Sequence, residues 1–495
     1  MKPLDVLVVS DLHYRSEPDA SEQSDRRGEF GVVLLRKCLN RLNHLGVKPG
    51  LLLVLGDVVD DGLNEDTRRH FAEVSEAVKK MGLRTLFVHG NHDGDTDRFE
   101  SVFNSPGFHE VEGVGFVIFN DAVAAGDVTT RQASDIALLN RVVTEHPGMP
   151  LVTLQHNPVY PPIDSSEYPY MLTNADEVLA DYMKKGVILS LSGHSHAGQP
   201  PCKIQSLTTY TVPTLCELPF AFAHVRLGDH GVEIKEHRLK MDVPGLADVH
   251  CHTEYAYCGT SVSAAKCLAV SELLGVGSVC VTEHSFQLYF ERDEAWSFRW
   301  QTDAAMVQEA WRKRSGRMDE YKKFAGTLRC DTVKLGLEVD LCSDGRILLA
   351  PEDEAGWDVL VGAIHAIPGY VKGKTSQAEA EEMFLEETRR MIANPINVLA
   401  HPFRFFLRGG LHIPKNLYPA VADMLAAKGV AAEVNFHIYV PDSLFVKECV
   451  KRGVKIALGS DGHDIVETGE LVPHLRVLEE AGVRQADFEK VLYKF

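Results

Sequence analysis

Two histidine pairs, each with one residue between its members, occur in the two halves of the sequence. His194 and His196 end the run LSLSGHSH, and His250 and His252 end the run GLADVHCH. Imidazoles that follow an apolar, strand-like run are typical of metal-binding loops. The residues before the first pair already offer a full set of metal ligands, so the second pair indicates a second metal site in the same chain.

Four earlier fragments of the first half add carboxylate, amide and imidazole groups to the first pair. They are SDLH, LGDVVD, GNHD and LQHN, with Asp11, His13, Asp57, Asp60, Asn91, His92, Asp93 and His156. Two divalent cations about 3.5 to 4 Å apart need a bridging carboxylate, terminal imidazoles and carboxylates, and open positions for a hydroxide and the substrate oxygens. A turn would explain GNHD alone, but the five fragments together favour a dinuclear site.

The second half carries a second series of such fragments. They are HCH, YCG, TEH, GLE, AIH, AHPFR and GSDGH, with His250, His252, Cys258, Glu283, His284, Glu338, His365, His401, Arg404, Asp461 and His463. Imidazole and carboxylate ligands together suit Zn²⁺, Mn²⁺ or Fe²⁺. In both halves nearly every such residue stands at or just after the C-terminal end of an expected strand, where α/β folds assemble their sites.

Apolar, β-branched runs alternate with helix-period segments along the whole chain, which predicts an α/β architecture. In the first half we expect strands at 5–10, 51–56, 83–90, 149–155 and 186–193, helices at 65–82 and 132–148, and a closing strand pair within 221–240. In the second half we expect seven strands, at 245–250, 275–284, 332–340, 357–365, 396–401, 429–436 and 454–463. Because the alternation restarts after 243–245, we predict domains at 1–242 and 243–495.

The first set of fragments resembles the calcineurin-like metallophosphoesterases, over residues 4–240. The resemblance implies a four-layer α/β/β/α sandwich in which Asp57 bridges two metal ions. It implies that Asp11, His13 and His196 complete one ion and that Asn91, His156 and His194 complete the other. It also implies that His92 faces the phosphoryl group, oriented by Asp93, and that Asp60 steadies ligands by hydrogen bonds. The segments HNPVYPP and LPFAFAHVRL look most like the branch that contains cyclic-nucleotide and other small phosphodiesterases.

The second set resembles the polymerase-and-histidinol-phosphatase (PHP) superfamily, over residues 245–475. The resemblance implies a seven-stranded (β/α) barrel with up to three metals and a bridging Glu338. The implied ligands are His250, His252, His284, Glu338, His365, His401, Asp461 and His463. Cys258 stands where the family usually has a ligand His or Asp, so it is a further ligand or a buried thiol. Glu283 stands where an Asp is usual beside the ligand His284, and we assign it to catalysis.

Two arginines are candidates for binding a substrate phosphate. Arg15 follows His13 by two residues, and Arg404 follows His401 by three. A guanidinium can hold phosphate with two parallel hydrogen bonds. For both arginines the alternative is a surface position or a structural ion pair.

Composition limits the partners. The formal net charge of −19 disfavours nucleic acid, which normally requires clustered Lys and Arg. The opening MKPLDVLVVSDLH lacks the features of a signal peptide, and no apolar run approaches the roughly 20 residues of a membrane helix. The ten cysteines contain no CxxC pair, as is usual for reduced thiols. We expect a cytoplasmic protein without a membrane partner, and the oligomeric state stays open.

Together these features predict a bifunctional metal-dependent phosphoesterase that acts on small phosphorylated substrates. A site with about two ions would open a small phosphodiester or cyclic phosphate, and a site with about two to three ions would hydrolyse a phosphomonoester, in sequence. The expected ions are Mn²⁺, Fe²⁺/Fe³⁺ or Zn²⁺. The alternatives are a nuclease or DNA-repair phosphodiesterase, and a chain in which one metal domain is silent and regulatory.

Overall fold

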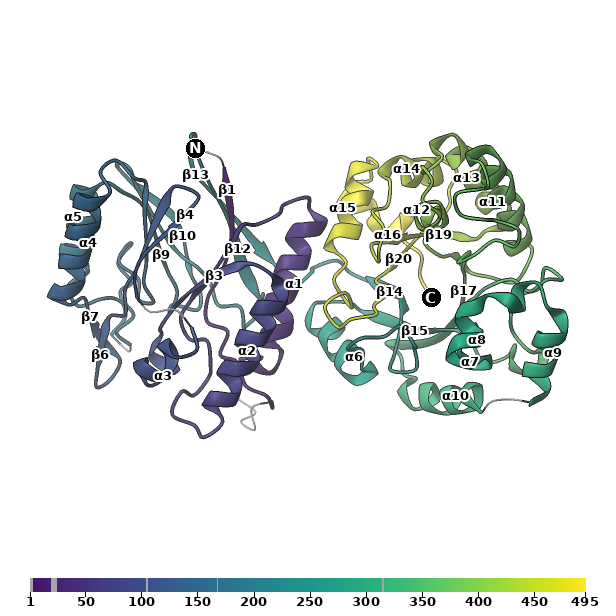
Figure 1. Cartoon of the computed structure of the whole chain (residues 1–495), viewed down its shortest axis with the longest axis horizontal. Coiled ribbons are helices and arrows are strands. Elements are labelled where there is room, and N and C mark those ends of the chain that lie inside the picture. The colour runs from purple at the N-terminus through teal and green to yellow at the C-terminus, as the bar shows by residue number, and fades with distance from the viewer. Residues whose placement is uncertain (1–2, 19–24, 104–105, 167, 314–315) are drawn as a thin grey trace. The chain divides into compact units, whose positions relative to one another are not determined.

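The computed structural model describes residues 3–18, 25–103, 106–166, 168–313 and 316–495. The chain forms two compact units, Met1–Lys240 (unit 1) and Met241–Phe495 (unit 2), and each is described by itself (Figure 1). Among the described residues, no helix is both long enough and apolar enough to cross a membrane.

Unit 1 contains two β-sheets. One has the strand order β13-β12-β1-β2-β3 and the other the order β10-β11-β9-β8-β5-β4. The strands of the first sheet are β1 (Leu4–Val9), β2 (Leu51–Leu55), β3 (Arg84–Val88), β12 (Ala221–Gly228) and β13 (Gly231–Arg238). The strands of the second are β4 (Gly107–Val111), β5 (Val114–Ile118), β8 (Leu151–Leu154), β9 (Val187–Ser192), β10 (Gln199–Ile204) and β11 (Leu207–Thr211). A short pair, β6 (Ala122–Ala124) and β7 (Val128–Thr130), lies outside both sheets.

The two sheets of unit 1 pack face to face. Alternate side chains of β1 and β2, such as Val6 and Leu53, share one core with Phe116, Val152 and Leu189 of the other sheet, because successive strand residues point to opposite faces. The helices are α1 (Gly31–His44), α2 (Thr67–Met81), α3 (Thr96–Glu100), α4 (Ala133–Glu145) and α5 (Ala175–Lys185). Helices α4 and α5 cover the outer face of the second sheet, where they build a second core, and α1 and α2 lie on the first (Figure 1). The predicted α/β/β/α sandwich is thus confirmed.

Unit 2 is a nearly closed barrel of seven parallel strands in sequence order, as predicted. They are β14 (Ala247–Cys251), β15 (Ser278–His284), β16 (Val333–Val339), β17 (Val359–Gly362), β18 (Val398–Leu399), β19 (Ala431–Asn435) and β20 (Ile456–Gly459). The first and last strands meet, since the Asp461 N–H donates to the His250 carbonyl oxygen at 2.7 Å. Small buried side chains such as Val249, Val361 and Ala457 form a core.

Helices follow most strands of the barrel and surround it (Figure 1). They are α6 (Ala264–Leu273), α7 (Ser285–Tyr289), α8 (Arg292–Ser297), α9 (Ala304–Lys313), α10 (Arg317–Leu328), α11 (Gln377–Met391), α12 (Arg404–Gly409), α13 (Tyr418–Lys428), α14 (Ser443–Lys451), α15 (Val472–Glu480) and α16 (Phe488–Val491). Because all the strands are parallel, their C-terminal ends meet at one rim, and the loops that carry the candidate ligands meet there too.

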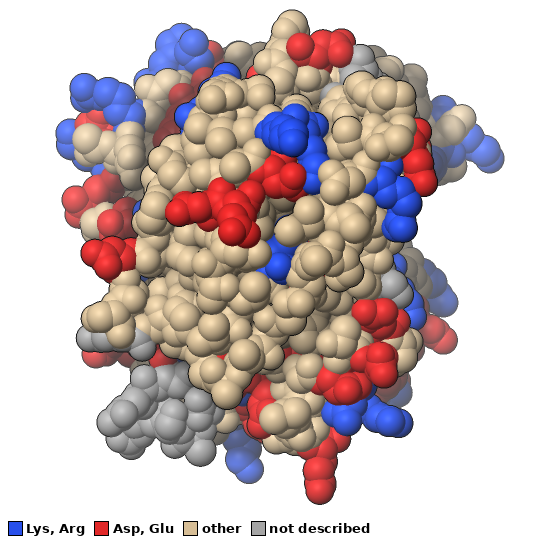
Figure 2. Space-filling view, turned by 90° about the vertical axis from the view of Figure 1, so that its left-hand side faces the viewer, with Lys and Arg blue, Asp and Glu red and all other residues tan. Residues whose placement is uncertain are grey.

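Charged side chains on one face of the protein are dispersed. Figure 2 views the side on which α4 and α5 lie in Figure 1. On this face Lys and Arg form separate groups interspersed with Asp and Glu, and most of the area is uncharged.

Candidate metal centres

Several predicted ligands have a left-handed backbone at the end of a strand. These are Asp11 (φ 54°), His13 (φ 42°), Asp57 (φ 47°), His194 (φ 66°), His401 (φ 29°) and Asp461 (φ 49°). This region is costly for residues with a Cβ atom, and such strain concentrates at functional sites. The chain turns sharply at these residues, and the turns direct their side chains toward shared points.

In unit 1 the side chain of Asp57 lies between two sets of predicted ligands. Its Oδ2 is 3.5 Å from His13 Nε2 and 3.3 Å from His156 Nε2. On the first side, His196 Nε2 lies 3.2 Å from His13 Nε2 and 3.7 Å from Asp11 Oδ1. On the second side, His156 Nε2 lies 3.1 Å from Asn91 Oδ1 and 3.1 Å from His194 Nδ1. Asp57 therefore occupies the place that a bridging carboxylate needs.

The opposite ring nitrogens of these histidines are held by other groups. His196 Nδ1 lies 2.7 Å from Glu217 Oε1, and His156 Nδ1 lies 2.8 Å from the Leu55 carbonyl oxygen. Both partners are hydrogen-bond acceptors, so both rings donate from Nδ1 and, when neutral, carry a lone pair on Nε2. Asp60 lies 3.3 Å from His13 Nδ1 and so contacts a ligand, as the resemblance implied.

The donor set of unit 1 fits the implied metal ions. Imidazole nitrogens and carboxylates converge at this buried centre, a donor set that suits divalent cations. Two buried polar atoms at the centre, Asp11 Oδ1 and His194 Nε2, have no hydrogen-bond partner among the described residues. Burial, followed by the charge of His156, lowers the pKa of His194 to about 3, which keeps this imidazole in the ligand form.

The ring of His92 faces the centre, where it forms a further set of potential donors with His13 and Asp57. It packs edge-on against His13, with ring centroids 4.7 Å apart, and lines a cavity of about 640 Å³ together with Asn91. Asp93 does not orient this ring, so that detail of the prediction is wrong. The two oxygens of Asp93 accept the backbone N–H groups of Val58, Val59 and Gly90, while His92 Nδ1 lies 2.7 Å from the Asp60 carbonyl oxygen.

Arg15, predicted to bind substrate, is engaged elsewhere. Its guanidinium lies 3.1 Å from Asp60 Oδ2 and donates to the Arg26 carbonyl oxygen at 2.9 Å, so it braces the ligand loop. Arg26 also contacts Asp60, at 3.0 Å, and lies 3.2 Å from His13 Nδ1. Arg26 was not predicted, because it lies in a polar loop without a recognisable motif.

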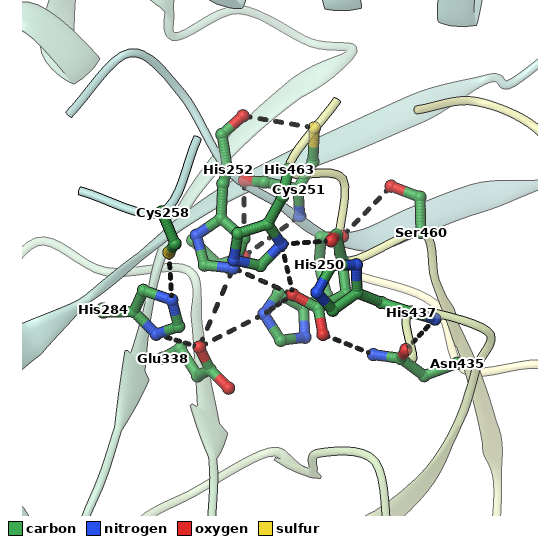
Figure 3. Close-up of polar contacts among 12 residues, drawn as sticks. His250, Cys251, His252, Cys258, His284, Glu338, Asn435, His437, Ser460 and His463 are labelled. Atoms are coloured by element: carbon green, nitrogen blue, oxygen red, sulfur yellow. Dashed lines mark hydrogen bonds and ion pairs between the residues drawn. The ribbon is translucent and has the colours of Figure 1, made fainter. Parts of the chain in front are cut away.

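In unit 2 the carboxylate of Glu338 lies among the predicted imidazole ligands (Figure 3). Its Oε1 is 2.9 Å from His401 Nε2 and 3.3 Å from His365 Nε2. Its Oε2 is 3.5 Å from His250 Nε2 and contacts His284 Nδ1. His252 Nε2 also lies 3.8 Å from Oε2, so Oε1 faces two imidazoles and Oε2 faces three, an arrangement that suits a bridging carboxylate.

The remaining predicted ligands lie beside this group. His252 Nε2 is 3.0 Å from Asp461 Oδ1, and His463 turns its Nδ1 to the Asp461 carbonyl oxygen at 2.7 Å, which leaves Nε2 for the centre. His252, His284 and His463 form one compact set of potential donors, and His250, His252 and Asp461 form another. Burial first, and neighbouring histidines next, lower the pKa of His463 to about 2, so it is a neutral imidazole.

Two carboxylates that were not predicted orient ligands of unit 2. Glu433 Oε1 lies 2.9 Å from His250 Nδ1, and Asp340 Oδ2 lies 2.9 Å from His365 Nδ1. A carboxylate on the outer nitrogen fixes the ring and makes the inner nitrogen a better metal ligand. Gly459 is required beside Glu433, since a Cβ atom there would overlap Glu433 Oε1. An acidic residue inside a buried strand was the available signal for Glu433.

We expect Glu433→Gln to weaken metal binding in unit 2 by about 10- to 100-fold. Glu433 accepts from His250 Nδ1 and, through Oε2, from the His401 backbone N–H at 2.5 Å. An amide keeps one acceptor and turns a donor toward one of these donors. Chelator titration followed by elemental analysis measures the loss. Glu386→Gln, on the exposed face of α11, is the matched control, and equal metal retention in the two variants would contradict the role of Glu433.

Cys258 and Glu283 lie at different positions relative to the unit 2 centre. Cys258 Sγ lies 3.4 Å from His284 Nε2, at the edge of the centre (Figure 3), and burial raises the pKa of this thiol to about 12. Glu283 is buried, accepts both the N–H and the hydroxyl of Thr253, and lies 3.5 Å from His252 Nδ1. Glu283 lies beside His252 and is held by Thr253, so a positioning role is the alternative that this geometry favours over the predicted catalytic one.

Arg404 is buried in a pair with a predicted ligand. Its guanidinium donates to Asp461 Oδ2 at 2.6 Å and lies 3.5 Å from His365 Nε2. Asn435 donates to the same Asp461 oxygen at 3.0 Å. Arg404 therefore holds Asp461 in place. The geometry favours a structural ion pair over direct binding of a substrate phosphate.

These two centres define the chain as a metal-dependent hydrolase of phosphoric esters, and comparison with known families agrees. The family profile described as calcineurin-like phosphoesterase matches residues 4–198, and the profile described as PHP domain matches residues 248–437. The chain therefore joins a calcineurin-like phosphoesterase domain to a PHP domain.

The chain has low sequence identity to the individual relatives. The chain is 25% identical over 274 residues to a probable histidinol-phosphatase of Deinococcus radiodurans, a match that covers 49% of this chain and 96% of the relative. It is 23% identical over 226 residues to a cAMP/cGMP dual specificity phosphodiesterase of Mycobacterium tuberculosis, which covers 42% of this chain and 68% of the relative. A solved dimetal phosphatase from Danio rerio is 17% identical with a TM-score of 0.40, covering 48% of this chain and 96% of that one.

Proposed function

We propose that the chain is a bifunctional phosphoesterase in which unit 1 hydrolyses a small phosphodiester or cyclic phosphate and unit 2 hydrolyses a phosphomonoester. The observation that carries the proposal is the pair of separate centres, each with a carboxylate between imidazoles whose outer nitrogens are held by the protein. We further propose that the centres hold about two and about two to three ions of Mn²⁺, Fe²⁺/Fe³⁺ or Zn²⁺, with the ligands predicted from the sequence. One relative is named a phosphatase and another a phosphodiesterase, which supports two activities.

The charges that line the two cavities support this division. The cavity at the unit 1 centre is lined by Asp60, Asp61, Asp95 and Asp127, and by neither Lys nor Arg among its described lining residues. The cavity at the unit 2 centre, about 310 Å³, is lined by Arg404 and Arg408 and also by Asp464 and Glu467. A phosphodiester carries one negative charge and a monoester about two at neutral pH, so the acidic cavity of unit 1 disfavours a monoester more than the cavity of unit 2, where arginines offset the carboxylates.

The residues of each centre have separate roles in the proposed reactions. When bound, divalent cations polarise phosphoryl oxygens and lower the pKa of water. Asp57 and Glu338 hold the two halves of their centres together, and the outer carboxylates Glu217 and Glu433 keep imidazoles in the tautomer that binds metal. His92, at the wall of the unit 1 cavity, is placed to contact the phosphoryl group or donate a proton to the leaving oxygen.

We expect His92→Ala to lower turnover of a diester by about 10²- to 10⁴-fold, the usual contribution of an acid–base group. Metal content should stay at the wild-type value, because the ligands proposed for the two ions do not include His92, although its ring lies near His13 and Asp57. Steady-state kinetics and elemental analysis on the same preparation check both statements. Loss of metal ions in this variant would show that His92 is a ligand and not a substrate-facing group.

Two alternatives to this proposal are a nuclease and a chain with one silent, regulatory metal domain. The formal net charge of −19 supports small substrates over a nuclease, which normally needs clustered Lys and Arg. The ligand-compatible geometry of both centres supports two active domains over one silent domain. A cytoplasmic location belongs to the proposal, and ten free cysteines support it.

The deciding experiment is a screen of phosphomonoesters, cyclic phosphates, phosphodiesters and single-stranded DNA. Wild type and one inactivated variant of each centre are compared at saturating Mn²⁺. The proposal requires diester activity to depend on unit 1 and monoester activity on unit 2. Higher activity on single-stranded DNA than on small esters would favour the nuclease.

A further inference from the structure

The cavity at the centre of unit 2 is lined in part by residues that are not proposed metal ligands. The candidate ligands His284, His365 and His463 line it, and so do Arg408, Trp296 and Ile438; Asp464 and Glu467 are among its other lining residues. A cavity of about 310 Å³ lies at the lower end of the range for small-molecule sites. A substrate bound at the metal ligands would therefore also contact Arg408, Trp296 and Ile438.

Arg408 is the available cation in this cavity. Arg404, one helical turn earlier on α12, is occupied by Asp461. The guanidinium of Arg408 makes no hydrogen bond or ion pair with another residue in the described part of the chain, whereas the nearby Glu467 is engaged, with Oε1 at 3.0 Å from His437 Nδ1 and Oε2 accepting the His463 N–H. An unpaired guanidinium beside a metal centre suits a phosphoryl group, which it can hold with two hydrogen bonds.

Trp296 presents an indole to the same cavity. Its side chain is 37% exposed and packs edge-on against Phe286, with ring centroids 5.5 Å apart. Phe286 in turn stacks on the fully buried Trp300 at 5.6 Å. The indole is thus held at the wall by a fixed aromatic cluster, and a partly open aromatic face next to a reactive centre favours a planar ligand.

Ile438 stands at the rim of the cavity in a strained conformation. It is 66% exposed with φ of 58°, which is an outlier for a β-branched residue. The loop is held by its neighbour, since the His437 ring stacks on His463 at 4.3 Å and bonds to Glu467. Strain retained at a ligand cavity indicates a functional position, and here it keeps an apolar side chain at the entrance.

We propose that Arg408 binds the phosphoryl group of the unit 2 substrate and that Trp296 and Ile438 flank its leaving group, so that the preferred substrate is a phosphomonoester of a planar, largely apolar alcohol or phenol. This inference rests on the proposed monoesterase activity of unit 2 and specifies its substrate class. The ordering it predicts is phenyl phosphate, or another aryl or heteroaryl monoester, above glycerol phosphate.

The test compares full-length wild type with Arg408→Gln, Arg408→Lys and Trp296→Ala at saturating Mn²⁺. We expect Arg408→Gln to lower kcat/KM about 10- to 100-fold for phenyl phosphate and glycerol phosphate alike, with partial recovery in Arg408→Lys. We expect Trp296→Ala to lower kcat/KM about 10-fold for phenyl phosphate and by less than about 2-fold for glycerol phosphate. Arg389→Gln, on the exposed surface of α11, is the matched arginine control and should match wild type.

Binding gives a readout that is independent of turnover. Calorimetric titration with phenylphosphonate, a non-hydrolysable analogue, should show the same losses, and elemental analysis should show unchanged metal content. Equal effects of Trp296→Ala on both esters, or wild-type kinetics and binding in Arg408→Gln, would overturn the inference. Absence of any monoester hydrolysis by metal-loaded wild type would instead overturn the proposed activity of unit 2.

Discussion

Glu338→Ala is expected to abolish hydrolysis of phosphomonoesters while leaving cleavage of a diester intact. Glu338 is fully buried and faces His250, His284, His365 and His401, so its removal leaves imidazoles without the carboxylate that joins them. Metal-based charge stabilisation is worth several kcal/mol, and about 4 kcal/mol corresponds to a loss of about 10³-fold. When the full chain is given a diester, the monoester product should accumulate.

The measurement follows diester, monoester and phosphate together, for instance by phosphorus NMR. Elemental analysis should show that this variant loses the ions of unit 2 and keeps those of unit 1. Glu386→Ala, an exposed glutamate on α11, controls for a nonspecific effect of removing a carboxylate. Full conversion of the diester to phosphate by Glu338→Ala would mean that unit 2 is not the monoesterase.

Asp57→Asn is expected to have the complementary effect. Asp57 Oδ2 faces His13 and His156, and Oδ1 accepts the His92 backbone N–H at 2.9 Å. Asparagine has nearly the same shape but is neutral and offers a donor in place of one oxygen, so it is a poor bridge between two cations. We expect diester cleavage to fall by about 10³-fold, while added monoester is still hydrolysed at the wild-type rate.

The two variants together test whether the activities act in sequence. A mixture of Asp57→Asn and Glu338→Ala should convert diester to phosphate through released monoester, whereas neither variant alone should do so. Asp176→Asn, exposed on α5, is the control for the first substitution. If Asp57→Asn still cleaves the diester at the wild-type rate, unit 2 attacks diesters itself and two parallel specificities replace the sequence of reactions.

The arrangement of elements could be predicted from local features. Buried strands such as β2 and β16 are short apolar runs, and helices such as α2 and α4 have a clear helical period. Both features depend on residues that are neighbours in the chain. The left-handed turns at Asp57 and Asp461 were not predicted, because nothing in their neighbours marks them.

The residue types at the strand ends also identified the chemistry. Histidine and carboxylate fragments in a recognisable order pointed to two metal centres, and the structure brings each set together, including His252 and Asp461, which are 209 residues apart. Motifs report which side chains are present at a strand end, and parallel strands then carry those ends to one rim.

The tertiary structure alone decided which partner each polar side chain takes. Arg15 pairs with Asp60, Arg404 pairs with Asp461, and Glu433 orients His250, although the sequence suggested substrate for the two arginines and no role for the glutamate. A charged side chain has the same identity whether it faces a phosphate or a carboxylate, and its preference is set by burial and by groups brought near from distant segments. The sequence determined that two metal-binding units exist, and only the closing of each fold determined which groups hold the metal ligands and which remain free for a substrate.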